Sequence, residues 1–237
     1  MKQIHHDVNA TYGKRRMRVE LREMGFTIGI EKVRCKMKML GLIAKRPKQH
    51  KYPAGEKASV LAPNKLNRQF NSSGLNQFWA GDITYIRTQQ GWLYLAVILD
   101  LCSRRVISWA FSDKPNSELT TRTLRLAVEK RKTQSGVVFH SDQGCQYTSE
   151  AYQSALRAHG IEASMSRAGN CLDNAVTERF FRSLKSERVN YCKYKTHEQA
   201  IVDIIDYIEP FYNQKRRHGK LGNIAPAQYE MNLLKSA

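Results

Sequence analysis

The sequence predicts an α/β fold: a mixed five-stranded sheet flanked by helices, with a small helical segment before it. Three runs, FWAGDITYIRT, WLYLAVILDL and RRVISWAFS, are rich in β-branched and aromatic residues and separated by short polar breaks, which indicates consecutive antiparallel strands. Further along, two short apolar runs, GVVFHSD and IEASMS, alternate with helical patterns, as β-α-β crossovers do. The 237 residues suffice for one packed domain with a small appendage.

The helical segment, residues 1–44, is expected to resemble a helix-turn-helix around the turn GFTIG. Two apolar stripes recur at helical spacing on either side of that turn: Met17, Leu21 and Met24, then Ile30, Val33, Met37 and Leu40. The second helix carries Lys32 and Lys36 among its cations, which suits a DNA groove or its phosphates. A solvated helical hairpin that only packs on its neighbour predicts the same pattern.

The remaining divisions follow from composition and periodicity. Residues 45–75 lack periodicity and are rich in Pro and Lys, which predicts a basic linker. The core domain that contains the sheet is expected over residues 76–190, with helices that start at Ser117 and near Thr148. A basic helical extension, 191–237, contains a helix over residues 197–213, begun by a Thr196/Gln199 capping box and interrupted by Pro210.

Composition indicates a polyanionic partner, of which nucleic acid is the usual one. The chain has 39 Lys and Arg against 21 Asp and Glu, a formal net charge of +18, and residues 1–70 hold 17 of those cations and 5 of those acids. The longest apolar run, WLYLAVIL, is far shorter than the roughly 20 residues that span a bilayer. The N-terminus has no signal core, so we expect a cytoplasmic, nucleoid-associated protein without a membrane partner. Five widely spaced cysteines predict neither disulfides nor a zinc site.

Three acids fall at positions where the predicted fold brings them together. Asp82 lies within the first strand, Asp142 ends the fourth, and Glu178 lies on the helix after the fifth. Like charges held close raise one another's pKa unless a cation lies between them. Two Mg²⁺ ions would remove that conflict, because Mg²⁺ prefers carboxylate oxygens and keeps waters that engage phosphate. Mn²⁺ is the expected substitute.

Each acid also has a simpler interpretation. Asp82 suits a salt bridge within a strand, Asp142 a turn, and Glu178 a solvated helix face with an i,i+4 pair to Arg182. His140 suits either a metal ligand or base, or a polar residue that holds the turn, and the second is preferred. Asp100 is interpreted as a strand-end residue paired with Arg104 or Arg105.

The segments named so far resemble the DDE transposases of bacterial insertion sequences, in the retroviral-integrase superfamily. The similarity covers roughly residues 60–230 and rests, in order, on WAGDITYI, WLYLAVILDLCSRRVISWA, HSDQGCQYTS, SMSRAGNCLDNAVTERFFRSLKSE and FYNQKRRHGKLGNIAPAQY. The 35 residues between Asp142 and Glu178 (178 − 142 − 1) match the spacing of the family's D-D-35-E signature.

The resemblance implies a ribonuclease-H-like core in which Asp82, Asp142 and Glu178 are the catalytic, metal-binding triad. It implies that Lys185 contacts the DNA end. The block G-N-x-x-D-N matches at Asn170, Asp173 and Asn174, where Asp173 or Asn174 is expected to cap the helix and orient Glu178. The remaining expected phosphate contacts come from two places: Arg182, and the basic run 214–220 with Lys215, Arg216 and Arg217. A flexible solvated loop is the alternative for that run.

The implied activity is metal-dependent DNA cleavage and strand transfer on the element's terminal repeats and on target DNA. Paired ends imply a homo-oligomer, and the two-frame organisation of the family implies an upstream-frame helix-turn-helix protein or a fusion with it. Two departures from the family pattern, Arg179 after the glutamate and Gln143 after the second aspartate, leave the triad intact. The alternatives are a ribonuclease-H-type nuclease that only hydrolyses and a non-catalytic DNA-binding remnant that acts as a repressor; a calcium-binding structural site is disfavoured because the acids lie far apart in sequence.

Overall fold

The computed structural model describes residues 1–45, 62–66, 72, 74–132, 136–166 and 174–236. The chain divides into two compact units. The sheet unit comprises His50–Arg182 and Lys193–Ile205, and the helical unit comprises Met1–Gln49, Ser183–Cys192 and Asp206–Ala237. Most of the predicted linker, residues 46–61, lies outside the described residues.

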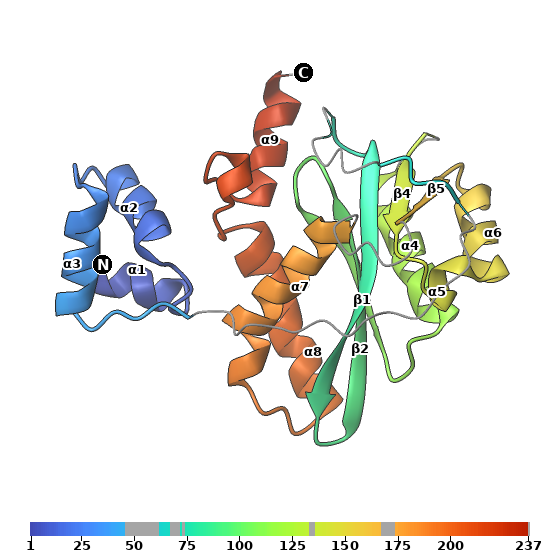
Figure 1. Cartoon of the computed structure of the whole chain (residues 1–237), viewed down its shortest axis with the longest axis horizontal. Coiled ribbons are helices and arrows are strands. Elements are labelled where there is room, and N and C mark those ends of the chain that lie inside the picture. Colours follow the sequence, from blue (N-terminus) through green and yellow to red (C-terminus); the bar gives the residue numbers. More distant parts are fainter. Residues whose placement is uncertain (46–61, 67–71, 73, 133–135, 167–173, 237) are drawn as a thin grey trace. The chain divides into compact units, whose positions relative to one another are not determined.

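The sheet unit contains the predicted mixed sheet of five strands, β1 (Phe78–Thr88), β2 (Gly91–Asp100), β3 (Val106–Ser112), β4 (Val138–Ser141) and β5 (Glu162–Met165). The order across the sheet is β3-β2-β1-β4-β5 (Figure 1). The pairs β1–β2 and β2–β3 are antiparallel, and β1–β4 and β4–β5 are parallel. The predicted meander and crossovers are therefore confirmed.

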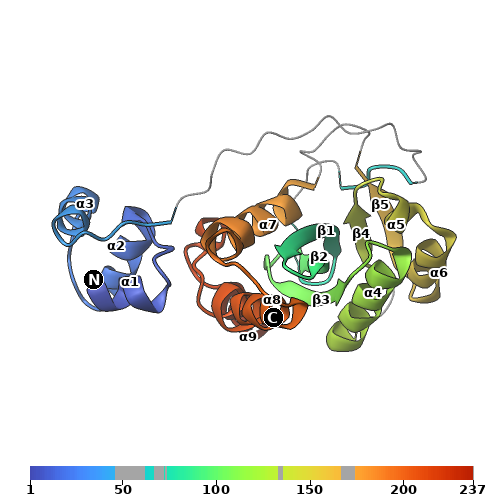
Figure 2. The ribbon, with the colours of Figure 1, turned by 90° about the horizontal axis from the view of Figure 1, so that it is seen from below.

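Helices α4 (Ser117–Arg131), α5 (Cys145–Thr148) and α6 (Glu150–Ala158) connect the later strands. Helix α4 contacts β2 and β3, α6 contacts β5, and the two helices contact each other, as Figure 2 shows. The helix expected from about Thr148 to His159 is confirmed as α6, and the short helix α5 before it was not predicted. Helix α6 starts where it does because Ser149 has an extended backbone and its side chain accepts the Tyr152 N–H.

An aromatic cluster fills the space between the sheet and helices α5 and α6. Phe139 on β4 packs against Tyr147 and Tyr152, with ring centroids 6.1 and 5.6 Å away, and Trp79 on β1 belongs to the same buried core. The glycine at position 81 makes room for the Phe139 ring, because a Cβ atom at that position would lie 2.4 Å from the ring. This core holds β1 and β4 together where the candidate acids lie.

Helices α7 (Ala175–Glu187) and α8 (His197–Asp206) run from one unit into the other. Pro210 was expected to interrupt the helix that begins near residue 197. The chain instead continues as a π-helix, Tyr207–Asn213, with Pro210 inside it, and the wider turn accommodates a residue that has no N–H to donate. The last helix, α9, spans Pro226–Ser236. No helix within the described ranges is long and apolar enough to cross a membrane.

The helical unit begins with α1 (Lys2–Asp7), α2 (Lys14–Glu23) and α3 (Ile30–Met39). One buried cluster of apolar side chains joins these three helices; its described members are Ile4, Met17, Leu21, Val33 and Met37. Helix α1 was not predicted. Met24 and Leu40, which we assigned to the apolar stripes, are 62% and 40% exposed. Each is the C-cap residue that follows its helix, so it has left the buried face.

Candidate active site

The parallel pairing of β1 and β4 brings two of the three acids to one place in the sheet. Ala80 on β1 is in register with His140 on β4. Asp82 lies two residues beyond Ala80 and Asp142 two residues beyond His140, so both carboxylates lie in the same direction along neighbouring strands. The order of the strands, with the fourth beside the first, produces this proximity.

Electrostatic effects show that the three carboxylates share one neighbourhood. Burial raises the pKa of the Tyr147 hydroxyl, and the charges of Asp82 and Asp142 raise it further. The pKa of Glu178 is raised by burial and then by the charge of Asp142. Tyr147 is therefore close to both aspartates, and Glu178 on α7 is close to Asp142.

Asp142 and Glu178 are acids whose charge is opposed by their surroundings. The pKa of Asp142 is raised by burial, offset only by a hydrogen bond 3.0 Å long from the Gly144 N–H. Among the residues that the structure describes, no cation lowers the pKa of either group. Ionising both is unfavourable unless a positive charge is supplied, since each disfavours the other's charged form.

The donor set fits a hard divalent cation, although the side chains do not form a closed cage. Within the residues that the structure describes, no group of three or more His, Cys, Asp and Glu side chains is arranged to hold a metal ion. Carboxylate oxygens are the donors that Mg²⁺ and Mn²⁺ prefer, and Mg²⁺ needs only one or two carboxylates because it retains waters. Asp142 and Glu178 match that requirement through their uncompensated charge.

Asn174 ties the start of α7 to β1. Its side-chain N–H donates to the carbonyl oxygen of Gly81 at 3.3 Å, and its side-chain oxygen accepts the Thr177 hydroxyl at 2.9 Å. Gly81 directly precedes Asp82, and Thr177 directly precedes Glu178. One buried amide thus links the backbone beside two of the acids, while Asn170 and Asp173 lie outside the described residues.

A second group of polar contacts holds the chain around Asp142. It joins His140 and Gln143, which the sequence pointed to, with Ser164 and Ser166, which were not predicted to take part. The buried His140 ring contacts the hydroxyl oxygens of Ser164 at 2.9 Å and Ser166 at 3.1 Å. The Gln143 amide donates to the carbonyl oxygen of Ser166 at 2.9 Å, and the Ser166 N–H donates to Ser141. His140 therefore has structural contacts on both nitrogens. The signal that was overlooked is Ser164 and Ser166 on one side of the strand IEASMS.

Asp100 has a structural role at the end of β2. Its fully buried carboxylate accepts the backbone N–H groups of Asn76 at 2.7 Å, Cys102 at 2.8 Å and Ser103 at 3.1 Å. Burial raises its pKa, and these hydrogen bonds counteract that effect. The sequence identified a strand-end residue, but these partners are backbone groups that close the turn after β2.

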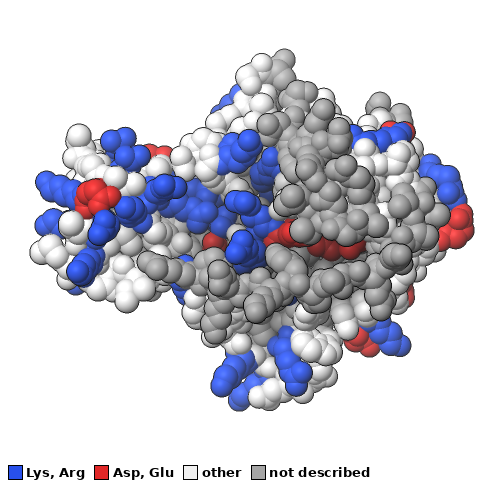
Figure 3. Space-filling model, in the orientation of Figure 1, with Lys and Arg blue, Asp and Glu red and all other residues white. Residues whose placement is uncertain are grey.

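The candidate phosphate contacts differ in exposure. Lys32 and Lys36 are exposed on α3, one helical turn apart, and Arg182 and Lys215 are also exposed, whereas Lys185 is half-buried. The helical unit has 20 Lys and Arg against 8 Asp and Glu. Figure 3 shows that blue side chains far outnumber red ones over the N-terminal helices.

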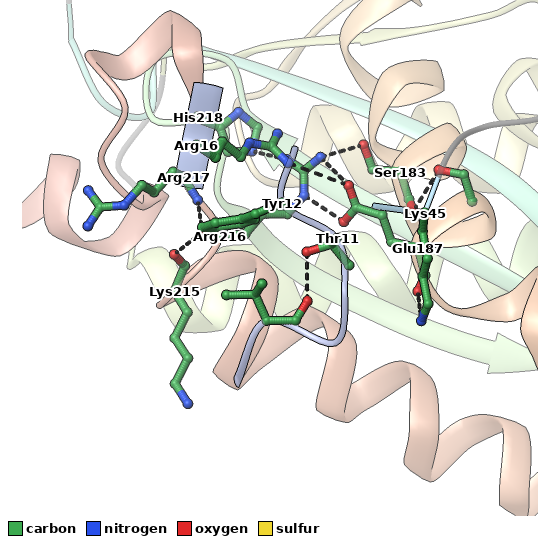
Figure 4. A network of polar contacts seen from close by, with 12 residues as sticks. Thr11, Tyr12, Arg16, Lys45, Ser183, Glu187, Lys215, Arg216, Arg217 and His218 are labelled. Atoms are coloured by element: carbon green, nitrogen blue, oxygen red, sulfur yellow. Dashed lines mark hydrogen bonds and ion pairs between the residues drawn. The ribbon is translucent and has the colours of Figure 1, made fainter. Parts of the chain in front are cut away.

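Arg216 and Arg217 have carboxylate partners, contrary to the expectation that both face phosphate. Arg216 is 5% exposed and its guanidinium contacts both carboxylate oxygens of Glu187 (Figure 4). Arg217 contacts Glu20 at 2.6 Å and also pairs with Glu23, both on α2. A contact between either guanidinium and DNA would require these ion pairs to open, so a cation-rich sequence alone was a poor guide here.

Comparison with known proteins identifies the family. Integrase core domain models match residues 73–171 and 178–234, and an HTH-like domain matches residues 1–50. The chain is 41% identical over 221 residues to the transposase InsF for insertion sequence IS3A of Escherichia coli (strain K12), covering 92% of this chain and 76% of that protein.

Two further matches agree. The transposase for insertion sequence element IS904 of Lactococcus lactis subsp. lactis (strain IL1403) is 38% identical over 231 residues, which cover 97% of this chain and 91% of that protein. A chain in the cryo-EM structure of the simian T-cell lymphotropic virus intasome shares the fold, with a TM-score of 0.54 at 18% identity over 96% of this chain and 73% of that chain.

Fold and site together define a polynucleotidyl transferase of the DDE class, built on a ribonuclease-H-like integrase core behind an HTH-like domain. The chain belongs to the integrase-core transposases of bacterial insertion sequences and acts in transposition and DNA integration. Enzymes of this family are metal-dependent. The predicted family, fold class and activity are thus confirmed, and neither alternative activity is favoured.

Proposed function

We propose that Asp82, Asp142 and Glu178 are the catalytic residues and together hold two divalent ions, Mg²⁺ in the cell and Mn²⁺ as a substitute. The observation that carries this proposal is the parallel register of β1 and β4, which brings Asp82 and Asp142 to the same place in the sheet. The raised pKa values of Asp142 and Glu178 agree with it, because each would be lowered by a bound cation. When bound, such ions activate the attacking hydroxyl or water and stabilise the charge that develops on phosphate and leaving group.

The protein's own residues orient these carboxylates. The Ser141–Gln143 segment is held by Ser166, which keeps the Asp142 carboxylate at the end of β4. Asn174 holds the start of α7 against β1, so it sets Glu178 relative to Asp82. Asn170 and Asp173 are proposed to support the site together with Asn174, with Asp173 or Asn174 as the cap of the helix that carries Glu178. Arg182 and Lys185, on the same helix as Glu178, would contact the phosphates of the DNA end.

DNA contacts by the helical unit complete the proposal. Lys32 and Lys36 on α3 and Lys215 are proposed to bind phosphates of the element's terminal repeats or of target DNA. In this proposal residues 1–44 bind DNA and residues 45–75 form a linker. Residues 76–190 form the catalytic core, and residues 191–237 are its C-terminal extension. We further propose a homo-oligomer on paired ends in the bacterial cytoplasm, acting with an upstream-frame helix-turn-helix protein or as a fusion with it.

A gel assay tests the catalytic assignment. Purified protein is incubated with labelled linear DNA that carries the element's terminal repeat, with Mg²⁺ or Mn²⁺, and joined products are quantified. Asp142→Asn should abolish joining, whereas the matched control Asp113→Asn should not, because Asp113 is an exposed loop acid that contacts Ser112. Shortened strands without joined products would contradict strand transfer, and unchanged DNA with wild-type protein would contradict catalysis by this chain alone.

Salt dependence tests the DNA contacts. Each lysine that neutralises a phosphate contributes about −0.9 to the slope of log K against log salt concentration. Lys32→Gln and Lys36→Gln should each weaken binding of duplex DNA and reduce that slope by about one. An unchanged slope in both variants would remove α3 from the proposed interface.

A further inference from the structure

Glu187 is a buried acid at an unfavourable position. It is the last residue of α7 and only 7% exposed. The C-terminus of a helix carries partial negative charge, which disfavours a carboxylate there, and burial disfavours it further. A glutamate at this position therefore requires partners, and its partners show what it does.

Three groups surround the Glu187 carboxylate, and Figure 4 shows two of them, Arg216 and Arg16. The Arg216 guanidinium binds it in a bidentate manner, with Nη2 to Oε1 at 2.7 Å and Nε to Oε2 at 2.8 Å. The Tyr207 hydroxyl donates to Oε2 at 2.8 Å, and Arg16 Nη1 lies 3.8 Å from Oε1. Buried ion pairs add little stability compared with apolar side chains of similar volume, but they can specify one arrangement of the chain.

Arg216 contacts two successive turns of α7. Besides Glu187, its Nη2 donates to the Ser183 hydroxyl oxygen at 3.0 Å. Residues four apart lie on one side of a helix, so these contacts fix which side of the last turns of α7 faces Arg216. Glu178 lies nine positions earlier (187 − 178), which at about 100° per residue is two and a half turns, so it points to the opposite side.

We propose that Arg216 and Glu187 are positioning residues that set the rotation of α7 and thereby the direction in which Glu178 presents its carboxylate. This inference rests on the proposed role of Glu178 as a metal ligand. A rotation of α7 by one residue position would turn Glu178 by about 100°, and the buried bidentate pair makes such a rotation unfavourable. Arg216 thus acts through α7 rather than on DNA.

The test is a double variant, Glu187→Met with Arg216→Met, which replaces the pair by apolar side chains and preserves net charge. It should fold, because such replacements are tolerated. At saturating DNA and metal, its strand-transfer rate should fall by about 10–100-fold, as for residues that orient metal ligands, with the KM for DNA unchanged within about twofold. The Mn²⁺ concentration at half-maximal thermal shift should rise by a similar factor, which a merely structural role would not produce.

A milder pair of variants decides the matter if the double variant does not fold. Ser183→Ala removes one of the two turns held by Arg216. Ser186→Ala removes a hydroxyl that donates only to the Ser183 carbonyl oxygen at 3.4 Å in the same helix. Ser183→Ala should reduce the rate about two- to fivefold, the loss expected for one hydrogen bond, and Ser186→Ala should not change it.

The outcomes separate this inference from the function on which it rests. A folded double variant with the wild-type rate and the wild-type Mn²⁺ midpoint overturns the positioning role and leaves the metal site standing. Equal rates for Ser183→Ala and Ser186→Ala do the same. Wild-type protein that neither joins DNA nor shows a metal-induced thermal shift sensitive to Asp142→Asn overturns both.

Discussion

Helix α7 carries two glutamates whose surroundings are opposite. Near its start, Glu178 has a raised pKa because burial and the Asp142 carboxylate both oppose its charge. At its end, Glu187 lies between Arg216, Arg16 and the Tyr207 hydroxyl. A partly buried acid without a compensating cation destabilises the fold, and such an acid is a candidate for binding a cation. An acid that is paired with a buried cation more often has a structural role. Proximity to cations in the sequence did not distinguish the two.

The largest expected effect is the loss of strand-transfer activity when Glu178 is replaced. Glu178→Gln should lower strand transfer by about a thousandfold or more, because a metal ligand worth several kcal/mol to the transition state is lost. The protein should remain folded, with a thermal midpoint in metal-free buffer no lower than that of wild type. Joined products in the gel assay measure the first effect and a melting curve the second. Near-normal joining by Glu178→Gln would show that this end of the helix does not serve catalysis.

At the other end, Glu187→Gln should act mainly on stability. It leaves the Arg216 guanidinium buried without its carboxylate, which typically costs about 3–5 kcal/mol. Urea unfolding followed by circular dichroism measures the loss, with Glu198→Gln, an exposed acid on α8, as the matched control. If both variants unfold at the same urea concentration, the contrast between the two ends of α7 fails.

A substitution at Gly81 tests whether the position of β1, to which Asn174 joins the start of α7, matters for activity. Gly81→Ala places a Cβ 2.4 Å from the Phe139 ring, so β1 or the aromatic cluster must shift, at a cost of about 1–3 kcal/mol. Because the Gly81 carbonyl oxygen accepts from Asn174, activity should fall more than stability alone explains. Gly29→Ala, which meets nothing within 4 Å, is the control in the same unfolding and joining assays.

The smallest expected effect is the pH dependence of stability. The folded-state pKa values of Asp142 and Glu178 are raised, so the unfolded chain releases these protons first as pH rises. Stability in metal-free buffer should therefore fall from about pH 4 upward, through the raised pKa values. Solvent screening should keep the change below about 1 kcal/mol, since the Asp142 residue retains an exposed surface even though the surrounding chain desolvates its carboxylate. Asp142→Asn or added Mg²⁺ should reduce the dependence, and thermal melts at several pH values measure it.

The sequence was informative where the signal is local. Alternation and β-branched runs located the five strands of the sheet, and the meander with its crossovers allowed the first and fourth strands to be neighbours, as they are. It was less informative at the ends of helices: the short helix α5 before Ser149 was not predicted, and Met24 and Leu40 proved to be cap residues. Those outcomes depend on a single side-chain or backbone conformation, which periodicity does not specify.

The sequence by itself determined the order of the elements and the family, because strand and helix periods are local patterns and the family's motifs can be read along the chain. It also singled out Asp82, Asp142 and Glu178 as candidate catalytic residues, from their places in the predicted elements and from the D-D-35-E spacing. The tertiary structure decided the partners: Asn174 with Gly81, Ser166 with Gln143, and Glu187 with Arg216. The Arg216 side chain looked like a DNA contact in a basic run, and only the packing of three distant segments gave it a buried carboxylate. The charge of a residue can be read from the sequence, but the tertiary structure decides which oppositely charged group neutralises it.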